Sequence, residues 1–375
     1  MKYTICVTQR CNLRCKYCYI YNQSSTMPIS VAEKIVDFIF KRTPSEENIY
    51  IGYFGGEPLL EFELIKKITK IIEDHPSFER DRVELSIVTN GTIYSEEIAR
   101  FVSEHGIVFG ISCDGPKFVH DQSRCFPNGR GSSDVVEMNI RQAREDFPSL
   151  MVNAVYHPRT FRHLFEVVDY FSSLGVVNIY LNPDFTARWT KREAEELPGI
   201  YDLISDKYID FYLEGKPHFI SLIDSKIAVI LRGGYKPLER CRMGNGEFAF
   251  APSGNIYLCE RLIGADEGNM HCIGNVVSGF SIDRVCGNRK STTGGNRECK
   301  DCGINDYCMN WCGCSNFFSS GEYDRVGPFL CASERAAINS AYRVIQTLEE
   351  KMGAVFSDHL AGSPSVNSYY PKLLR

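Results

Sequence analysis

The stretch Cys11-Asn12-Leu13-Arg14-Cys15-Lys16-Tyr17-Cys18 places three cysteines on one short loop, separated by three and then by two residues. The apolar run of residues 2–8 directly before it predicts a β-strand. Three thiolates on such a loop can hold three corners of an iron–sulfur cube and leave one iron open to a substrate or cofactor. A zinc knuckle is the alternative, because tetrahedral thiolate sites also bind zinc.

Strand and helix patterns alternate outward from this loop to about residue 185. The predicted strands are short and almost continuously apolar, and they cover residues 2–8, 48–54, 84–89, 107–113, 150–156 and 175–181. The predicted helices begin at Ser30, which with Glu33 has the pattern of a capping box, and then cover residues 62–73, 95–105, 134–145 and 160–173. This βα series predicts either an incomplete barrel or a doubly wound parallel sheet.

Polar and glycine-rich segments follow successive predicted strands. They are Gly55-Gly56-Glu57-Pro58, Thr89-Asn90-Gly91 and Ser112-Cys113-Asp114-Gly115-Pro116, with Arg124 a little further on. Each segment alone is also compatible with a plain turn. In a βα series, however, the carboxyl ends of the strands meet at one edge, where ligands bind. The order of these segments therefore predicts a polar ligand at the same edge as the cysteine loop.

These motifs resemble the radical S-adenosylmethionine (radical SAM) superfamily over residues 2 to about 185. The resemblance implies a partial (β/α)6 barrel of the TIM type. It also implies that Cys11, Cys15 and Cys18 hold a [4Fe–4S] cluster whose open iron is chelated by S-adenosylmethionine. By the same resemblance, the residues that contact this cofactor are Tyr17, Gly55, Gly56, Glu57, Ser112 and Arg124.

A second group of cysteines occupies the last third of the chain. Cys241 and Cys259 are followed by Cys299, Cys302, Cys308, Cys312 and Cys331, in a segment rich in glycine and poor in apolar residues. Because such a segment can build little core, metal is expected to stabilise it. A zinc ribbon is the alternative, but it would use only two closely spaced pairs of these cysteines.

The seven spacings resemble the SPASM domain, an extension of radical SAM enzymes that modify peptides and proteins. The resemblance implies two auxiliary [4Fe–4S] clusters and therefore three clusters in all. Cys241, Cys259 and Cys312 would bind the nearer auxiliary cluster, and Cys299, Cys302, Cys308 and Cys331 the distal one. The eighth cysteine of fully ligated members is missing. The fourth site of the nearer cluster is then open, taken by a substrate thiolate, or closed by Cys272 or Cys314.

The predicted domain organisation follows from these two resemblances. Residues 1–190 are the radical SAM partial barrel of an α/β fold, and residues 191–239 are a helical bridge. Residues 240–352 form a small Cys-rich SPASM domain with a β-hairpin near residues 252–255 and a C-terminal helix over residues 332–352. Residues 353–375 are predicted to be a tail.

The resemblance implies an oxidoreductase that reductively cleaves S-adenosylmethionine to a 5′-deoxyadenosyl radical, which abstracts hydrogen from a peptide residue. Two substrates compete: a ribosomally synthesised, Cys-containing peptide matured by a thioether or other crosslink, and, second, a sulfatase whose Cys or Ser becomes formylglycine. Glu260 follows Cys259 where sulfatase-maturing enzymes have an acidic residue, and is a candidate general base. A non-catalytic iron–sulfur or zinc scaffold is the alternative of another class.

Composition limits the partners and the compartment. The chain has 375 residues, a net charge of −5, 24% charged residues and 16 cysteines. We see no basic run for a nucleic acid, no membrane span and no export signal, which predicts a cytoplasmic protein with metal sites rather than disulfides. The oxygen-sensitive clusters that the resemblance implies would require an anaerobic or microaerobic cytosol. The expected partners are a peptide or protein substrate and a low-potential donor such as ferredoxin or flavodoxin. Because the first strand begins at Lys2, leader recognition would need a separate protein or an edge strand of the barrel that pairs with the peptide.

Overall fold

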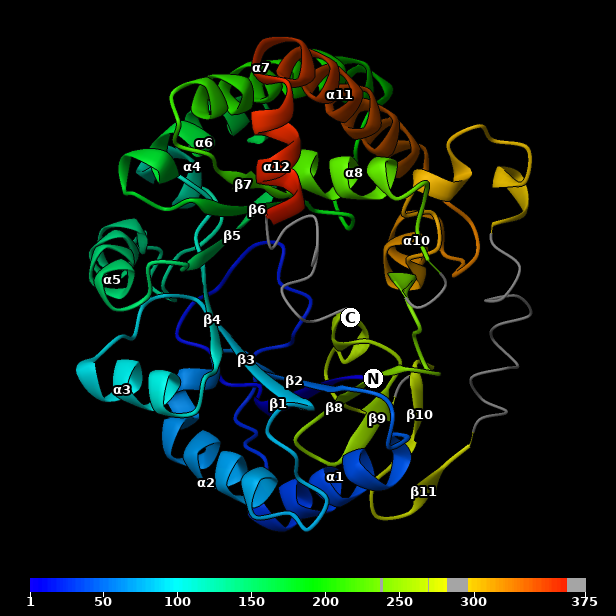
Figure 1. Cartoon of the computed structure of the whole chain (residues 1–375). Helices are drawn as coiled ribbons and strands as arrows, with labels where there is room; N and C mark the ends of the chain where they lie inside the picture. Colours follow the sequence, from blue (N-terminus) through cyan, green and yellow to red (C-terminus); the bar gives the residue numbers. More distant parts are fainter. Residues whose placement is uncertain (237–238, 269, 282–295, 363–375) are drawn as a thin grey trace. The chain divides into compact units, whose positions relative to one another are not determined.

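A computed structural model describes residues 1–236, 239–268, 270–281 and 296–362 (Figure 1). The chain forms two compact units. The first comprises Met1–Ser112, Asp121–Ala143 and Arg242–Lys290, and the second comprises Cys113–His120, Arg144–Cys241 and Ser291–Arg375. Each unit is therefore built from three separate segments of the chain. The domain boundaries expected from the sequence stay a prediction.

The first unit contains four parallel strands that pair in chain order, each with most of its side chains buried. They are β1 (Lys2–Thr8), β2 (Ile49–Gly55), β3 (Val83–Thr89) and β4 (Val108–Ser112). Helices connect these strands, as the blue and cyan part of Figure 1 shows: α1 (Ile29–Arg42), α2 (Phe62–Glu73) and α3 (Glu96–Glu104). α5 (Ser133–Asp146) begins in this unit. Parallel strands joined by helices confirm the βα series.

A hairpin from the last third of the chain extends the sheet of the first unit. β8 (Glu247–Phe250) pairs in parallel with β1, and β9 (Asn255–Tyr257) turns back antiparallel to β8. β10 (Cys272–Asn275) and β11 (Gly279–Phe280) add two further antiparallel strands. The hairpin predicted near residues 252–255 is thus confirmed, and its sheet is continuous with β1.

The second unit combines a short parallel sheet with long helices. Its strands are β5 (Met151–Tyr156), β6 (Asn178–Pro183) and β7 (Phe219–Ile220). Its helices are α4 (Lys117–His120), α6 (Leu164–Ser173), α7 (Lys191–Leu213), α8 (Ser221–Leu231), α10 (Gly313–Ser320), α11 (Pro328–Met352) and α12 (Ala354–Gly362). α7 and α11 pack along each other (Figure 1).

Two local predictions are wrong. Ser30 does not cap α1, because the helix begins one residue earlier at Ile29 and has Pro28 at its N-cap without a side-chain cap. The carbonyl of Pro28 already accepts from Val31 and Ala32, so Ser30 lies inside the first turn. Residues 354–362 form α12 rather than a tail, with the buried side chains of Phe356 and Leu360 holding the helix in place. Residues 363–375 lie outside the described part of the chain.

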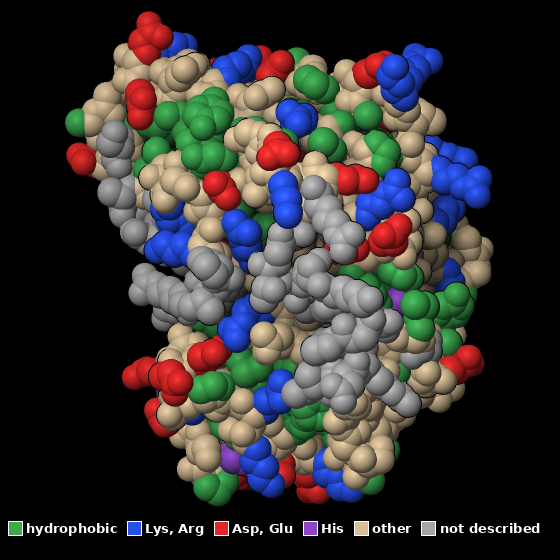
Figure 2. Space-filling view, turned by 90° about the vertical axis from the view of Figure 1, so that its right-hand side faces the viewer, with side chains coloured by type: hydrophobic (Ala, Val, Ile, Leu, Met, Phe, Trp, Pro, Cys, Tyr) green, Lys and Arg blue, Asp and Glu red, His purple; other side chains and the backbone are tan. Residues whose placement is uncertain are grey.

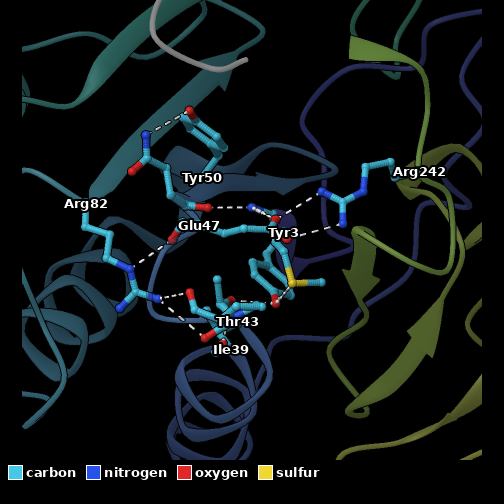
Figure 3. Close-up of polar contacts among 10 residues, drawn as sticks. Tyr3, Ile39, Thr43, Glu47, Tyr50, Arg82 and Arg242 are labelled. Atoms are coloured by element: carbon cyan, nitrogen blue, oxygen red, sulfur yellow. Dashed lines mark hydrogen bonds and ion pairs between the residues drawn. The ribbon is translucent and has the colours of Figure 1, made fainter. Parts of the chain in front are cut away.

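Two arginines tie the loop between α1 and β2 to its surroundings (Figure 3). Arg82 donates to the carbonyl oxygens of Thr43, Pro44 and Glu47, and Arg242 forms a 3.0 Å ion pair with the Glu47 carboxylate. Arg242 directly follows Cys241 and opens the last segment of the first unit. This segment is therefore anchored at the amino ends of β1 and β2 by charge as well as by the pairing of β8.

Acidic and basic side chains are interspersed over the described part of the face in Figure 2, in keeping with the small net charge. Among the described residues, no helix is both long and apolar enough to span a membrane.

Candidate cofactor site and cysteine clusters

The cysteine loop leaves β1 and lies directly on the Gly55-Gly56 pair at the end of β2. The amide of Gly56 donates to the Thr8 carbonyl and the amide of Glu57 donates to the Arg10 carbonyl, both at 2.8 Å. A Cβ atom at Gly55 would lie 2.4 Å from the Thr8 carbonyl oxygen, and one at Gly56 would lie 2.3 Å from that of Arg10. Both positions therefore exclude any side chain, because backbone lies against backbone.

Neighbouring segments of the first unit hold the loop in place. The amides of Arg14 and Lys16 donate to the carbonyls of Cys125 and Ser123, at 2.7 and 3.1 Å. On the β3 side, the Asn12 amide group donates to Thr92 Oγ1 and its Oδ1 accepts from Asn90, both at 2.8 Å. The predicted segment Thr89-Asn90-Gly91 thus contacts the cysteine loop, as expected from its place at a strand end.

None of the three cysteines of the loop forms a disulfide; Cys11 and Cys15 are half-buried and Cys18 is exposed. Cys11 Sγ accepts from the Leu13 amide at 3.4 Å and from Asn90 Nδ2 at 3.7 Å. Burial raises the pKa of the Cys11 thiol, and the charge of Glu57 adds to this effect. Donors aimed at sulfur fit a thiolate ligand of a cluster. The described residues contain no group of three that converges on a single metal ion, but a cubane takes each thiolate on a different iron.

Glu57 is fully buried and accepts three hydrogen bonds. Its Oε1 accepts from the Leu59 amide and Thr89 Oγ1, at 3.0 and 2.7 Å, and its Oε2 accepts from the Asn90 amide at 2.7 Å. Burial raises the pKa of Glu57 to about 7, although these hydrogen bonds and the charge of Arg124 oppose the rise. The carboxylate therefore joins the ends of β2 and β3, and the one donor to Oε2 among the described residues leaves a second lone pair on this oxygen.

Arg124 and Tyr17 lie near this carboxylate. The guanidinium carbon of Arg124 is 5.4 Å from the centre of the Tyr17 ring, a cation–π distance, and Arg124 is buried. Its charge acts on Glu57 as described above. Ser112 is half-buried at the end of β4. The structure thus brings Tyr17, Arg124 and Glu57 to the same end of the first unit's sheet as the cysteine loop.

Glu260 begins the short 3-10 helix η4 (Glu260–Leu262) in the first unit. The Cys259 thiol donates to Glu260 Oε2 at 3.4 Å. Burial alone would raise the pKa of Glu260, but the charges of Lys2 and Arg261 hold that pKa below its usual value. The pKa of Tyr19 is raised well above its usual value, mainly by burial and then by the charges of Glu260, Cys259 and Cys18. These three side chains therefore lie near the Tyr19 ring. An ionised carboxylate is a hydrogen-bond acceptor first and only a weak base.

Four cysteines gather in the second unit. Arg335 Nη2 donates to Cys302 Sγ at 3.4 Å. The pKa of Arg335 is raised, first by a hydrogen bond to Cys331 and then by the charges of Cys331, Cys302 and Cys308. Burial and the charges of Cys302 and Cys331 raise the pKa of Cys299, against a hydrogen bond from Asn310. The residues predicted to bind the distal cluster are therefore neighbours, with cationic and amide donors beside their sulfurs.

The residues expected around the nearer auxiliary cluster divide between the units: Cys259 and Cys272 belong to the first, and Cys241, Cys312 and Cys314 to the second. Cys314 Sγ is 3.7 Å from Cys312 Sγ at the start of α10. Cys272 packs against a hydrophobic cluster around Cys6 and Tyr257, and its thiol donates to the Gly274 carbonyl. Of the two rescue ligands that the sequence offers, Cys314 therefore lies beside the predicted ligand Cys312.

Two sets of polar contacts near these cysteines were not predicted from the sequence. Gln9, fully buried, donates to the Gly264 carbonyl at 2.9 Å and accepts from Ser25 at 3.0 Å, which ties the cysteine loop to the loop after η4. A buried ion pair joins Lys226 to Glu334 close to Cys308. Gln9 directly precedes the motif, which was a usable signal, whereas nothing in the sequence pairs Lys226 with a residue more than a hundred positions away.

Part of the chain matches a known protein family. The family model of the Radical SAM superfamily matches residues 5–171. A cysteine-type anaerobic sulfatase-maturating enzyme of Clostridium novyi (strain NT) is 26% identical over 271 residues, which is 68% of this chain and 71% of the relative.

Two solved structures share the fold. Native anSMEcpe with bound AdoMet and Cp18Cys peptide has a TM-score of 0.75 at 21% identity, over 93% of this chain and 99% of that chain. Streptococcus suis SuiB bound to precursor peptide SuiA has a TM-score of 0.59 at 15% identity, over 88% and 75% of the two chains. These likenesses confirm the expected fold class, a TIM-like radical SAM barrel followed by a SPASM domain. With the CNLRCKYC loop at the carboxyl end of β1, the family match identifies residues 5–171 as a radical SAM domain, in a chain that is similar to anaerobic sulfatase-maturating enzymes.

Proposed function

We propose that the protein is a radical SAM enzyme that modifies a residue within a peptide or protein. The observation that carries this proposal is the convergence of the cysteine loop, the Gly55-Gly56 pair and buried Glu57 at one end of one sheet. A scaffold that only binds metal would need neither an iron left open by a loop of three thiolates nor an adjacent cradle of glycine backbone.

In this proposal, Cys11, Cys15 and Cys18 hold the [4Fe–4S] cluster, and Gly55, Gly56 and Glu57 receive the ammonium group of S-adenosylmethionine. Cluster and cofactor together supply the 5′-deoxyadenosyl radical that abstracts hydrogen from the substrate. Glu57 has an unfilled acceptor position on Oε2, and a bound ammonium would favour its ionised form. Tyr17, Arg124 and Ser112 are proposed to line the remainder of the cofactor site.

For the substrate, we propose a Cys-containing peptide that receives a thioether or another crosslink. The missing eighth SPASM cysteine supports this choice, because an open position on the nearer auxiliary cluster could accept a substrate thiolate. Both of the similar solved structures are peptide complexes by their own descriptions. The two auxiliary clusters, a ferredoxin or flavodoxin donor and a separate leader-binding protein complete the proposal.

Sulfatase maturation is the second candidate, and one observation favours it. The Clostridium novyi relative carries that name, and Glu260 here occupies the acidic position beside Cys259. In that reaction Glu260 would accept a proton from the substrate. Its ionised state allows this step, but its lowered pKa makes it a weak base.

Anaerobic reconstitution tests the proposal. The wild-type protein should bind about twelve irons in three four-iron clusters and release 5′-deoxyadenosine under reducing conditions. Cys15→Ala should lose about four of these irons and all cleavage, and a variant that still cleaves the cofactor would refute the assignment. Incubation with a Cys-containing peptide and with a sulfatase-derived peptide separates the two substrates. A crosslink removes two hydrogen atoms, whereas formylglycine creates an aldehyde that a hydrazide traps.

A further inference from the structure

A buried ion pair in the second unit lies against a short loop that contains Cys308. Lys226 lies on α8 and Glu334 on α11, and Lys226 Nζ is 2.7 Å from Glu334 Oε2. The two side chains are only 3% and 8% exposed. Burying two charges costs free energy that their mutual attraction often only just recovers, and apolar replacements are frequently as stable. The pair therefore calls for an explanation other than stability.

The pair holds the backbone on both sides of Cys308. Lys226 Nζ donates to the carbonyl of Tyr307 at 3.1 Å, and the amide of Met309 donates to Glu334 Oε2 at 2.5 Å. Tyr307 ends the 3-10 helix η6 (Asn305–Tyr307), and Cys308 itself is extended, with φ −102° and ψ 144°. The chain is no longer helical at Cys308, so the Tyr307 carbonyl and the Met309 amide are satisfied by these two side chains instead of by regular backbone hydrogen bonds.

Tyr235 completes the arrangement. Its hydroxyl accepts from Lys226 Nζ at 3.4 Å, and the same ammonium lies 5.4 Å from the centre of the Tyr235 ring. Cys308 is 6% exposed, so contacts with the protein rather than with solvent determine the orientation of its side chain. The three donors of Lys226 thus face a carboxylate, a carbonyl and a hydroxyl, which defines one position for the ammonium and, through it, for the loop.

We propose that Lys226 and Glu334 are positioning residues that hold Cys308 in the orientation required to bind the distal auxiliary cluster. This inference rests on the proposed function, in which Cys308 is a ligand together with Cys299, Cys302 and Cys331. In this proposal Lys226 and Glu334 are not iron ligands; they hold the carbonyl before Cys308 and the amide after it, and Glu334 also hydrogen-bonds the Cys308 thiol directly.

The test is the double variant Lys226→Met/Glu334→Leu in the full-length protein. Without metal, its unfolding temperature should fall no further than that of the Leu348→Ala control below, because removing both buried charges together offsets the lost partners of the Tyr307 carbonyl and the Met309 amide. After anaerobic reconstitution, its iron content should fall toward that of Cys308→Ala, and a chelator should remove iron from it faster than from the wild type. A variant that keeps wild-type iron content and release rate would overturn the inference.

Two controls separate positioning from general destabilisation. Leu348→Ala opens a cavity in α11 at a fully buried side chain, so it should lower the unfolding temperature but keep the full iron content. Lys207 forms an ion pair of the same 2.7 Å length with Asp169, but the side chains of Lys207 and Asp169 are 24% and 57% exposed. Lys207→Met should therefore change neither the unfolding temperature nor the iron content. If Leu348→Ala loses iron as the double variant does, the pair is merely structural and the inference fails.

Failure of the proposed function would look different. If Cys308→Ala keeps all of its iron, Cys308 is not a ligand, and the assignment itself is wrong. If Cys308→Ala loses iron and the double variant does not, only the inference fails. Should the double variant not fold, Lys226→Met/Glu334→Gln keeps an acceptor for the Met309 amide. It should lose iron to an intermediate extent, and wild-type iron content in it would contradict the inference.

Discussion

Gly56→Ala is the substitution that most directly tests the packing of the cysteine loop on β2. The new Cβ would lie 2.3 Å from the Arg10 carbonyl oxygen, 2.6 Å from its carbon and 2.7 Å from the Gln9 carbonyl oxygen. Contacts below 3.0 Å are essentially never seen for a real Cβ, and all three obstacles are backbone. The chain at Gln9 and Arg10 must therefore move away from β2, and Cys11 must move with it.

The size of the effect follows from these contacts. Overpacking of this kind costs about 1–3 kcal/mol, and loss of the hydrogen bond from the Glu57 amide to Arg10 adds about 1 kcal/mol. We expect Gly56→Ala to lower the unfolding free energy of the metal-free protein by about 2–4 kcal/mol on this reckoning. The reconstituted variant should also bind less iron and cleave S-adenosylmethionine poorly, because the loop and the cofactor cradle are displaced together.

The matched control is Gly199→Ala. Gly199 lies within α7 with nothing inside 4 Å of its ideal Cβ position, so the change should stabilise the protein by up to about 1 kcal/mol and leave iron binding unchanged. Urea unfolding, iron analysis and 5′-deoxyadenosine release check both variants. The reasoning is refuted if Gly56→Ala unfolds like the wild type and cleaves the cofactor at the wild-type rate.

Three further outcomes are expected. Glu57→Gln should weaken binding of S-adenosylmethionine roughly 10- to 150-fold, from the loss of about 1.5–3 kcal/mol of charge-assisted hydrogen bonding, and calorimetry showing unchanged affinity would remove Glu57 from the site. The pKa of Glu57 is raised to about 7 from 4.5, so the folded protein binds a proton more tightly than the unfolded chain; unfolding free energy should fall as pH rises from 4.5 to 7, a slope that Glu57→Gln should reduce. In a Cys11→Ala/Cys15→Ala/Cys18→Ala variant, a Cys-containing substrate should shift the electron paramagnetic resonance signal of the auxiliary clusters and its Ser analogue should not; a shift caused only by Cys314→Ala or Cys272→Ala would mean that the protein closes the fourth site.

Much of the candidate site was predictable from the sequence because its signals are local. Cys11, Cys15 and Cys18 lie within eight residues, and their spacing already indicates metal chemistry. The strands were predictable to within a few residues because parallel strands covered on both faces are almost continuously apolar. The two cysteine groups predicted a barrel followed by a metal-dependent part with little apolar core, but the segment from Arg242 joins the first unit through β8 and buries Phe248, Phe250 and Tyr257.

The tertiary structure decided the relations between distant segments. In the sequence, Gly55 and Gly56 are compatible with a turn or a cofactor cradle, and only the tertiary structure shows that the backbone at Thr8 and Arg10 leaves no room for side chains there. The capping box at Ser30 did not form because the helix uses Pro28, two residues earlier, as its N-cap, and the difference in free energy between two such starts is too small for a sequence pattern to resolve. Lys226 and Glu334 meet only because α8 and α11 pack together, and no periodicity encodes such a pair. Local spacing therefore specified the chemistry of this protein, and long-range packing specified which residues hold that chemistry in place.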